Sequence, residues 1–227
     1  MLWFLALFAC DRTYDGPLPD AETAGVFGRV VGLLGGGVGD VDICAHDLDV
    51  PCVTSASDGD FLLEPLPFDA DVIITMEKDG HLPTAYHHHT TLTQEWRKTL
   101  MSQGIVDLMT GRVDTEQEPG MGHALFILWE GPDYDAFDRV AGVSFDVHGA
   151  SSGEQFYQAD GGLPDADLTA TSSSGSGGVF NLVPGRYELT FSGATCEPWF
   201  SHDFAPGGPV PVTILPDRAS YFDLVCR

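Results

Sequence analysis

One pattern of residues occurs twice in this chain. In residues 52–75 a run containing Thr and Ser leads through Asp58-Gly59 to a short apolar run, and a proline turn then leads to another. Residues 168–191 repeat this order, with a glycine-rich turn followed by Pro184-Gly185. Short apolar runs bounded by Gly, Pro and Asp predict strands separated by tight turns. The two copies therefore predict two similar β domains.

Length and charge set further bounds on the chain. Its 227 residues fit two domains of roughly 100 residues each. Acidic residues number 34 against 10 basic ones, a formal net charge of -24. A surface this negative repels phosphate backbones and anionic lipid headgroups. We therefore expect a globular, loop-rich protein that does not bind nucleic acid.

The first ten residues are apolar and end in Leu7-Phe8-Ala9-Cys10. This ending resembles the lipobox of bacterial lipoproteins, in which the cysteine is lipidated and becomes the first residue after cleavage. Phe8 is bulky for a position usually occupied by a small residue, and no basic residue precedes the run. An ordinary N-terminal core strand is the alternative. Since no later segment approaches the ~18 apolar residues of a membrane span, we expect a lipid anchor at Cys10.

The four remaining cysteines are even in number, and the two proposed domains contain two each. Three pairings are possible in principle, and the domain division favours Cys44 with Cys52 and Cys196 with Cys226. Disulfides require an oxidising compartment, in agreement with an export signal. Buried free thiols are the alternative, whereas a zinc site is disfavoured because no Cys-x-x-Cys spacing occurs.

The spacing of apolar residues changes to a helical period between the two predicted domains. Trp96 and Leu100 lie on one helical face, and Thr91 and Gln94 have capping-box spacing. This predicts a helix over roughly 92–103. The predicted organisation is listed from the N-terminus: a signal segment at 1–10, a tether at 11–24, a first domain at 25–86, a linker at 87–119 and a second domain at 120–227.

Short predicted strands follow one another in the second domain, at 140–148, 155–159, 167–172, 178–182, 186–192, 210–215 and 220–226. Strands at this spacing, each bounded by turn residues, are typical of an antiparallel sandwich. The predicted fold is all-β, with two antiparallel Ig-like or transthyretin-like β-sandwiches joined by a short helical linker.

The first copy also carries a family pattern between Val26 and Pro83. It has Gly-x-Val in the first strand, Val41-Asp-Ile43, Asp58-Gly-x-Phe61 and a following Leu-Pro turn. This resembles the carboxypeptidase regulatory-like domain, a transthyretin-like β-sandwich of the carbohydrate-binding-like superfamily. The second domain resembles a divergent copy, which retains Pro184-Gly-Arg-Tyr187 but lacks the Asp-Gly turn. The resemblance implies a sandwich and is silent on activity, because such folds host unrelated functions.

Motifs for catalysis are absent from the sequence. No His-Glu-x-x-His occurs for a zinc peptidase, and no Gly-x-Ser-x-Gly for a serine hydrolase. The glycine-rich segment 32–39 is not followed by the Lys-Ser/Thr of a phosphate-binding loop. We therefore predict a protein that is not an enzyme and needs no cofactor.

Two groups of residues are candidate metal ligands. His87 and His89 would share one face of an extended strand and could bind a transition metal with help from a carboxylate, or lie on a solvated edge. Aspartates spaced two apart could converge on Ca²⁺, and the best cluster is Asp40, Asp42, Asp47 and Asp49. The sequence contains no complete calcium-binding loop.

A sugar site would need an exposed aromatic platform. Trp199 beside Cys196 is the best candidate, with Tyr157 behind it, although an aromatic next to a disulfide is more often part of a core. The leading hypothesis is a non-enzymatic, lipid-anchored cell-envelope protein that faces the periplasm or cell surface and acts as an interaction or structural module for another envelope protein. The alternative is a carbohydrate-binding lipoprotein with a glycan as partner.

Overall fold

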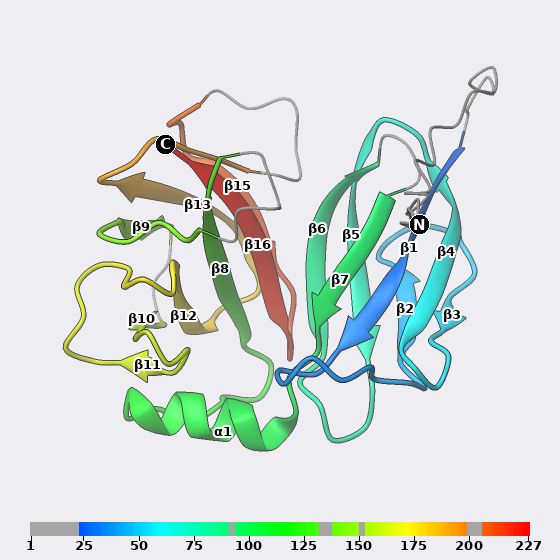
Figure 1. The fold of residues 1–227 in the computed structure, drawn as a ribbon, viewed down its shortest axis with the longest axis horizontal. Coiled ribbons are helices and arrows are strands. Elements are labelled where there is room, and N and C mark those ends of the chain that lie inside the picture. The colour runs from blue at the N-terminus through cyan, green and yellow to red at the C-terminus, as the bar shows by residue number, and fades with distance from the viewer. Residues whose placement is uncertain (1–22, 91–93, 132–137, 150–152, 199–205) are drawn as a thin grey trace, which may run out of the picture.

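The computed structural model describes residues 23–90, 94–131, 138–149, 153–198 and 206–227. Over these residues the chain is mostly β, with several sheets and one short helix (Figure 1). None of the described helices has the length and apolar character needed to cross a bilayer.

We call β1 to β7 the first half and β8 to β16 the second half. The first half contains β1 (Thr23–Val31), β2 (Asp42–Ala45), β3 (Val53–Thr54), β4 (Asp60–Pro67), β5 (Ala70–Glu77), β6 (Thr84–Thr90) and β7 (Gln94–Thr99). The helix α1 (Gln103–Arg112) follows. The second half contains β8 (Gly122–Glu130), β9 (Ser144–His148), β10 (Glu154–Gln158), β11 (Pro164–Asp165), β12 (Ser176–Leu182), β13 (Gly185–Ser192), β14 (Cys196–Pro198), β15 (Val210–Ile214) and β16 (Ala219–Cys226).

Both copies of the repeated segment form corners between sheets. In the first copy, Gly59 has a φ of 90° and turns the chain into β4. β4 pairs with β1, whereas β5 pairs with β2 and β6, so the chain changes sheet at the proline turn. In the second copy, β12 and β13 likewise lie in different sheets. The strand predicted at 167–172 is irregular, and its Thr171 hydroxyl bonds to the backbone of Val140 and Val143.

A single ten-stranded sheet runs through both halves. Its order is β11-β10-β12-β8-β16-β6-β5-β2-β3, and β14 also pairs with β16. The C-terminal strand β16 therefore lies between a strand of the first half and a strand of the second, and it is parallel to both. The expectation of two separate antiparallel sandwiches is corrected by these parallel pairs and by the shared sheet.

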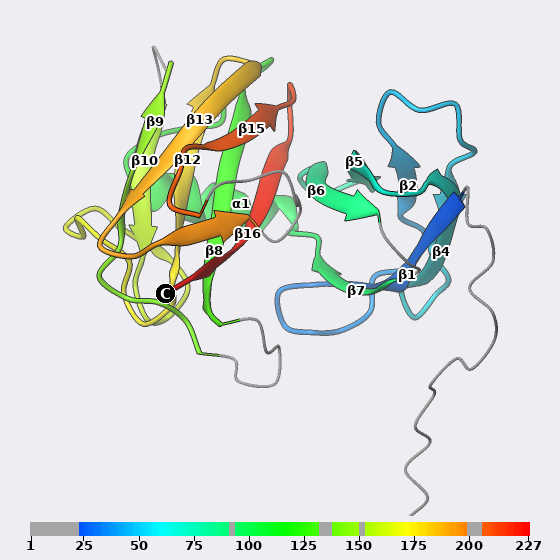
Figure 2. The same cartoon turned by 90° about the horizontal axis from the view of Figure 1, so that it is seen from above.

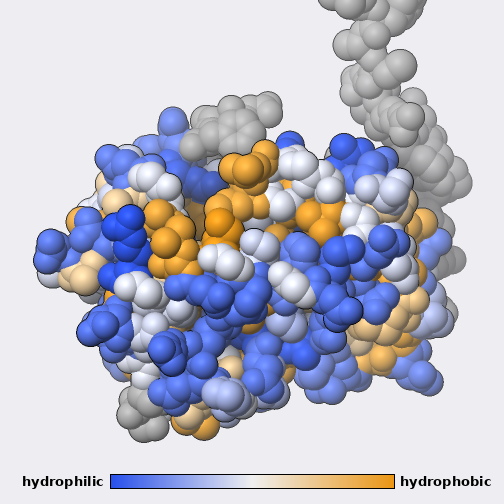
Figure 3. Space-filling view, turned by 90° about the horizontal axis from the view of Figure 1, so that it is seen from below, coloured by the Kyte–Doolittle hydropathy of each residue, from blue (hydrophilic) through white to orange (hydrophobic). Residues whose placement is uncertain are grey.

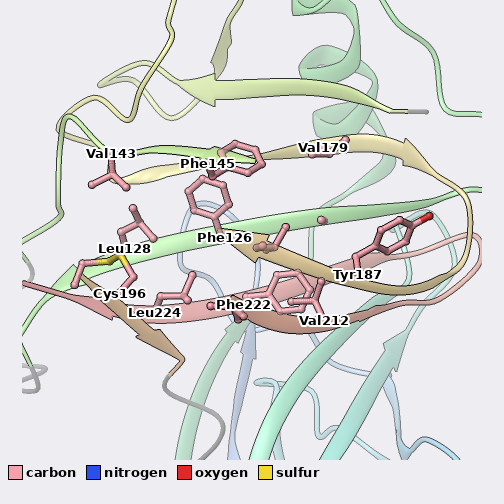
Figure 4. Packing of buried hydrophobic residues seen from close by; sticks show 14 of the residues in the cluster. Phe126, Leu128, Val143, Phe145, Val179, Tyr187, Cys196, Val212, Phe222 and Leu224 are labelled. Carbon is pink, nitrogen blue, oxygen red and sulfur yellow. A yellow bond between two sulfur atoms is a disulfide. The ribbon is translucent and has the colours of Figure 1, made fainter. Parts of the chain in front are cut away.

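Two three-stranded sheets cover opposite faces of the shared sheet. On one face, β4-β1-β7 packs over the first half, with Val30, Leu63, Ile74 and Trp96 in the core. On the other face, β15-β13-β9 packs over the second half (Figure 2), and Figure 4 shows Phe126, Phe145 and Phe222 within that core. The strands that supply the first core are β1, β2, β4, β5, β6 and β7, and those that supply the second are β8, β9, β10, β12, β13, β14, β15 and β16.

The helix lies later in the chain than predicted. Residues 94–99 form β7, which pairs with β1 in parallel, and α1 begins at Gln103. The helix prediction over 92–103 is wrong because Trp96 is buried, Arg97 is exposed and Lys98 is partly buried, an alternation that strand pairing satisfies. Parts of the predicted linker at 87–119 are therefore strand, because β6 continues to Thr90 and β7 covers Gln94–Thr99.

Candidate functional site

The junction between the two halves is centred on β16. Its first three residues pair with β6 and its last three pair with β14, so two neighbours share one edge of the strand. Tyr221 stacks on Tyr86 of β6 with 5.2 Å between ring centroids. Arg218 Nη1 lies 2.9 Å from Glu77 Oε1, and the Ala219 N–H donates to the Pro83 carbonyl. The halves are joined by backbone, aromatic and charged contacts.

An ion pair crosses this junction. Lys98 Nζ on β7 donates to Asp223 Oδ2 at 2.6 Å, and Trp129 Nε1 on β8 donates to Asp223 Oδ1 at 3.1 Å. The side chains of Lys98 and Asp223 are only 17% and 19% exposed. Burial works to raise the pKa of Asp223, but the Lys98 ammonium and the two hydrogen bonds outweigh it and lower the pKa. The carboxylate is charged and links three strands.

Aromatic rings surround the two cations of this site. Lys98 Nζ lies 5.0 Å from the ring centroid of Tyr86 and 5.1 Å from that of Trp96. The guanidinium of Arg139 lies 3.3 Å from the ring centroid of Trp129, and burial lowers the pKa of Arg139 to about 10. Cation–π contacts strengthen when water is excluded. Both cations of this site thus lie against aromatic rings.

The three consecutive histidines face different surroundings. His88 points into the first core, where its ring lies 4.5 Å from that of Trp96, and burial lowers its pKa to about 3. His87 is on the opposite face, where Nε2 lies 3.1 Å from the Thr213 carbonyl oxygen and the ring lies 4.9 Å from Phe222. Burial lowers the pKa of His87 to about 4. His87 and His89 do share one strand face, as predicted.

His89 lies between two carboxylates. Nδ1 is 2.7 Å from Asp71 Oδ1, and Nε2 is 3.1 Å from Asp69 Oδ1. Partial burial disfavours the charged imidazole, but the hydrogen bonds to Asp71 and Asp69 outweigh it and raise the pKa of His89. Both nitrogens thus face oxygen acceptors, an arrangement that favours an imidazolium over a metal ligand. His87 instead bonds to the second half.

The four aspartates predicted to bind calcium do not converge. Asp40 Oδ2 lies 4.0 Å from Lys78 Nζ, and Asp42 accepts a hydrogen bond from Thr54. Asp47 lies beside His46, and Asp49 is exposed. Within the described ranges, no three His, Cys, Asp or Glu side chains are placed to hold a metal ion.

Two disulfides form among the described residues, one in each half. Cys44 is bonded to Cys52 and Cys196 to Cys226, the pairing that the sequence favours. The second bond joins β14 to the last residue of β16, where the two cysteines are in register. It therefore fastens the end of the strand that both halves share.

The predicted aromatic platform is not supported at Tyr157. Its side chain is 4% exposed in the core of the second half, and its hydroxyl accepts hydrogen bonds from the Phe145 N–H and Gln155 Nε2. Tyr157 lies on the face of β10 that packs against Phe145 of β9, and it is therefore part of the core. Trp199 and Cys10 lie outside the described residues.

Sequence reasoning missed a polar cluster beside α1. Asn181, with a φ of 58°, donates through Nδ2 to Thr115 and Glu116 and accepts from the Glu118 N–H. It holds the segment after α1 beside a polar cavity of about 890 Å³, lined by Gln103, Asp107, Thr110, Gly111, Asp114, Thr115, Glu116 and Gln117. Asn181 interrupts the apolar strand β12, and Asp223 interrupts the apolar strand β16 in the same way, which was the signal available in the sequence.

A threonine and a histidine come into contact on the outer face of the second half. His148 Nε2 lies 2.9 Å from Thr190 Oγ1, and both groups are exposed. No carboxylate among the described residues orients this imidazole, whereas a nucleophile and its base normally need such a third group. The pair is a surface hydrogen bond between β9 and β13.

Comparisons with known proteins place the chain in no family. No protein-family model and no curated protein matches it. Solved structures that match include the Bacillus anthracis TIE protein, at 9% identity and a TM-score of 0.28, with 90% of this chain and 34% of that one covered. A streptococcal ancillary pilin matches at 16% identity and a TM-score of 0.27, over 92% of this chain and 63% of that one.

A third structure, the major pilin subunit BcpA of Bacillus cereus, matches at 7% identity and a TM-score of 0.29, over 90% of this chain and 99% of that one. The chain spans about a third of the first of these proteins and less than two thirds of the second. TM-scores this low do not establish a shared fold. The resemblance to the carboxypeptidase regulatory-like domain stays a prediction.

Proposed function

We propose that this chain is a non-enzymatic, lipid-anchored protein of the cell envelope whose two halves act as one rigid structural or adhesion module. The observation that carries the proposal is the position of β16. A strand that pairs along its length with β8 and at its start with β6 cannot leave one half without disrupting the other. A rigid two-part body suits a protein that spaces or presents a surface, and its partner would be another envelope protein.

The contacts around β16 support this rigidity. Lys98, Asp223 and Trp129 connect β7, β16 and β8 through hydrogen bonds in a site largely closed to water. A third hydrophobic cluster joins Leu82 and Met101 of the first half to Leu125 and Phe180 of the second, with α1 between them. Large apolar contact between domains opposes their relative motion.

The two disulfides support a location outside the cytoplasm. Disulfides persist in oxidising compartments and are rare where thiols are kept reduced. Cys10 in its lipobox-like context supplies the anchor, and the net charge of -24 favours solubility beside the membrane. Glycan binding through Trp199 remains the alternative prediction.

Cell fractionation tests the location and the anchor together. We expect the wild-type chain in the membrane fraction with both disulfides formed, and we expect Cys10→Ser to release a folded chain into the extracytoplasmic soluble fraction. Labelling with a fatty-acid probe should follow Cys10. A cytoplasmic chain with reduced cysteines would overturn the proposed location, and two separate calorimetric transitions would overturn the rigid module.

A further inference from the structure

The loop after β1 ends in a tip that exposes two leucines. We call residues 32–37 the leucine tip. The Gly35 N–H donates to the Gly32 carbonyl and the Gly32 N–H donates to the Gly36 carbonyl, each at 2.8 Å. Gly35 has a φ of 84°, which favours glycine. Leu34 is 100% exposed and Leu33 is 56% exposed, so the tight turn presents both side chains to solvent.

The base of the leucine tip is held against the rest of the first half. The Val38 N–H donates to the Val30 carbonyl at 2.9 Å, and Gly37 bridges to Val31. A Cβ on Gly37 would lie 1.8 Å from the Asp58 carbonyl oxygen, so only glycine fits this close approach. The loop is thus closely packed below its apex. The exposure of the leucines is a property of the folded loop rather than of a loose segment.

The leucine tip itself carries no charged side chain, and Asp40 and Asp58 lie beside its base. Residues 32–39 are Gly, Leu or Val without exception, although the chain carries 34 acidic side chains. The charged groups that reach this segment's carbonyl oxygens are cations: Arg97 Nη2 lies 3.4 Å from Gly35, and Lys78 Nζ lies 2.6 Å from Gly39. Arg97 is exposed and forms no ion pair with the other described residues.

This combination fits a phospholipid surface better than a protein pocket. Protein hot spots are enriched in Trp, Tyr and Arg, and leucine is under-represented among them. Aliphatic side chains beside an arginine instead match the boundary between acyl chains and phosphate groups. In Figure 1 the loop after β1 and α1 both lie at the lower edge of the molecule, and Figure 3 shows separate apolar patches among mostly hydrophilic residues on that face. Leu108 on α1 is 45% exposed.

We propose that the leucine tip inserts into the interfacial layer of a zwitterionic phospholipid bilayer, with Arg97 at the level of the phosphates. This inference rests on the proposed function, because it gives the lipid-anchored chain a second membrane contact. Residues 11–22 can extend to ~40 Å, more than the ~30 Å length of β1, so anchor and tip can reach one bilayer.

Vesicle binding tests the proposal with the full chain carrying Cys10→Ser, which separates the tip from the lipid anchor. Sedimentation with phosphatidylcholine vesicles should fall at least ~10-fold when Leu33→Ser and Leu34→Ser are combined, because two apolar side chains are lost from the interface. Leu62→Ser is the matched control, since Leu62 is 45% exposed on the outer face of β4. It should leave sedimentation unchanged.

Fluorescence gives a second, direct readout. Tryptophan introduced by Leu34→Trp should be quenched by lipids brominated in their acyl chains, whereas Leu62→Trp should add no quenchable signal over the parent. Equal quenching of both variants, or unchanged sedimentation of the double serine variant, would overturn the proposal. If the double serine variant lost binding to an envelope protein while its vesicle binding stayed unchanged, the proposal would also be overturned. Whether Cys10 is lipidated is tested separately, by fractionation of the wild-type chain.

Discussion

The two copies of the repeated segment make the same corner but assign their strands to opposite sheets. In the first copy, β4 belongs to a small outer sheet and β5 to the shared sheet. In the second copy, β12 belongs to the shared sheet and β13 to the other small sheet. The local pattern therefore specifies a change of layer, and the layer that each strand joins depends on distant partners. The two small sheets lie on opposite faces of the shared one (Figure 2).

Removing β16 should have the largest effect on stability, because both halves depend on this strand. A chain ending at Arg218 lacks the strand between β6 and β8, and it also exposes both hydrophobic cores. We expect the loss of cooperative unfolding in both halves, measured by circular dichroism and by dispersion of amide NMR signals. Deletion of Arg227 alone is the control. A first half that keeps dispersed signals without β16 would show that the halves fold independently.

The two disulfides should differ in their contribution to stability. They close loops with sequence separations of 8 and 30 residues. In the loop-entropy model these contribute about 2.5 and about 3.6 kcal/mol. Paired serine substitutions at Cys196 and Cys226 should therefore lower the free energy of unfolding by about 1 kcal/mol more than those at Cys44 and Cys52. Urea titration measures both, and the reverse order would contradict the prediction.

Breaking the ion pair between Lys98 and Asp223 should lower the free energy of unfolding by less than removing the Cys196–Cys226 disulfide. Lys98→Ala leaves a largely buried carboxylate without its cation, and we expect a loss of about 1 to 3 kcal/mol in the free energy of unfolding. Lys98→Met combined with Asp223→Leu should recover most of that loss, since it removes both charges. A double-mutant cycle measures the coupling. Additive effects of the single changes would show that the pair does not couple the halves.

The smallest expected effect is the pH dependence contributed by His89. Its pKa is raised in the folded state above the ordinary value of 6.5, so the stabilisation is present below that value and is lost as pH rises through the folded pKa. Because Asp69 and Asp71 are well exposed, we expect less than about 1 kcal/mol. NMR titration of the His89 ring should show the raised pKa, and Asp71→Asn should lower it. An unchanged pKa in that variant would contradict the assignment.

The sequence predicts the strands better than it predicts their partners. The turn at Asp58-Gly59 and the strand entry at Pro184-Gly185 are local features, and both occur where glycine and proline require them. The predicted helix failed because pairing of β7 with β1 overrides a helical spacing of Trp96 and Leu100. The position of β16 depends on contacts with residues 84–86, which no local pattern encodes.

The candidate site was predicted only in part. The alternation of His87 and His89 follows from strand geometry, and the structure has them on one face. Their partners Thr213, Asp69 and Asp71 lie on other strands and turns, so a single sequence gives no sign of them. Lys98 and Asp223 are far apart in the chain and meet only once the shared sheet forms. Asp223 within the apolar strand β16 was the available signal, whereas Lys98 lies in the polar strand β7 and gave none.

The central position of β16 also determines when the chain can complete its fold. Ala219 to Cys226 follow all the other described strands in the chain, yet they occupy the middle of the largest sheet. Neither half can complete its sheet before these residues have been synthesised, so both halves should complete their folding only after β16 has been made. The bond between Cys196 and Cys226 can likewise form only once β16 has been made, so it would fix a strand that is already in place between the two halves.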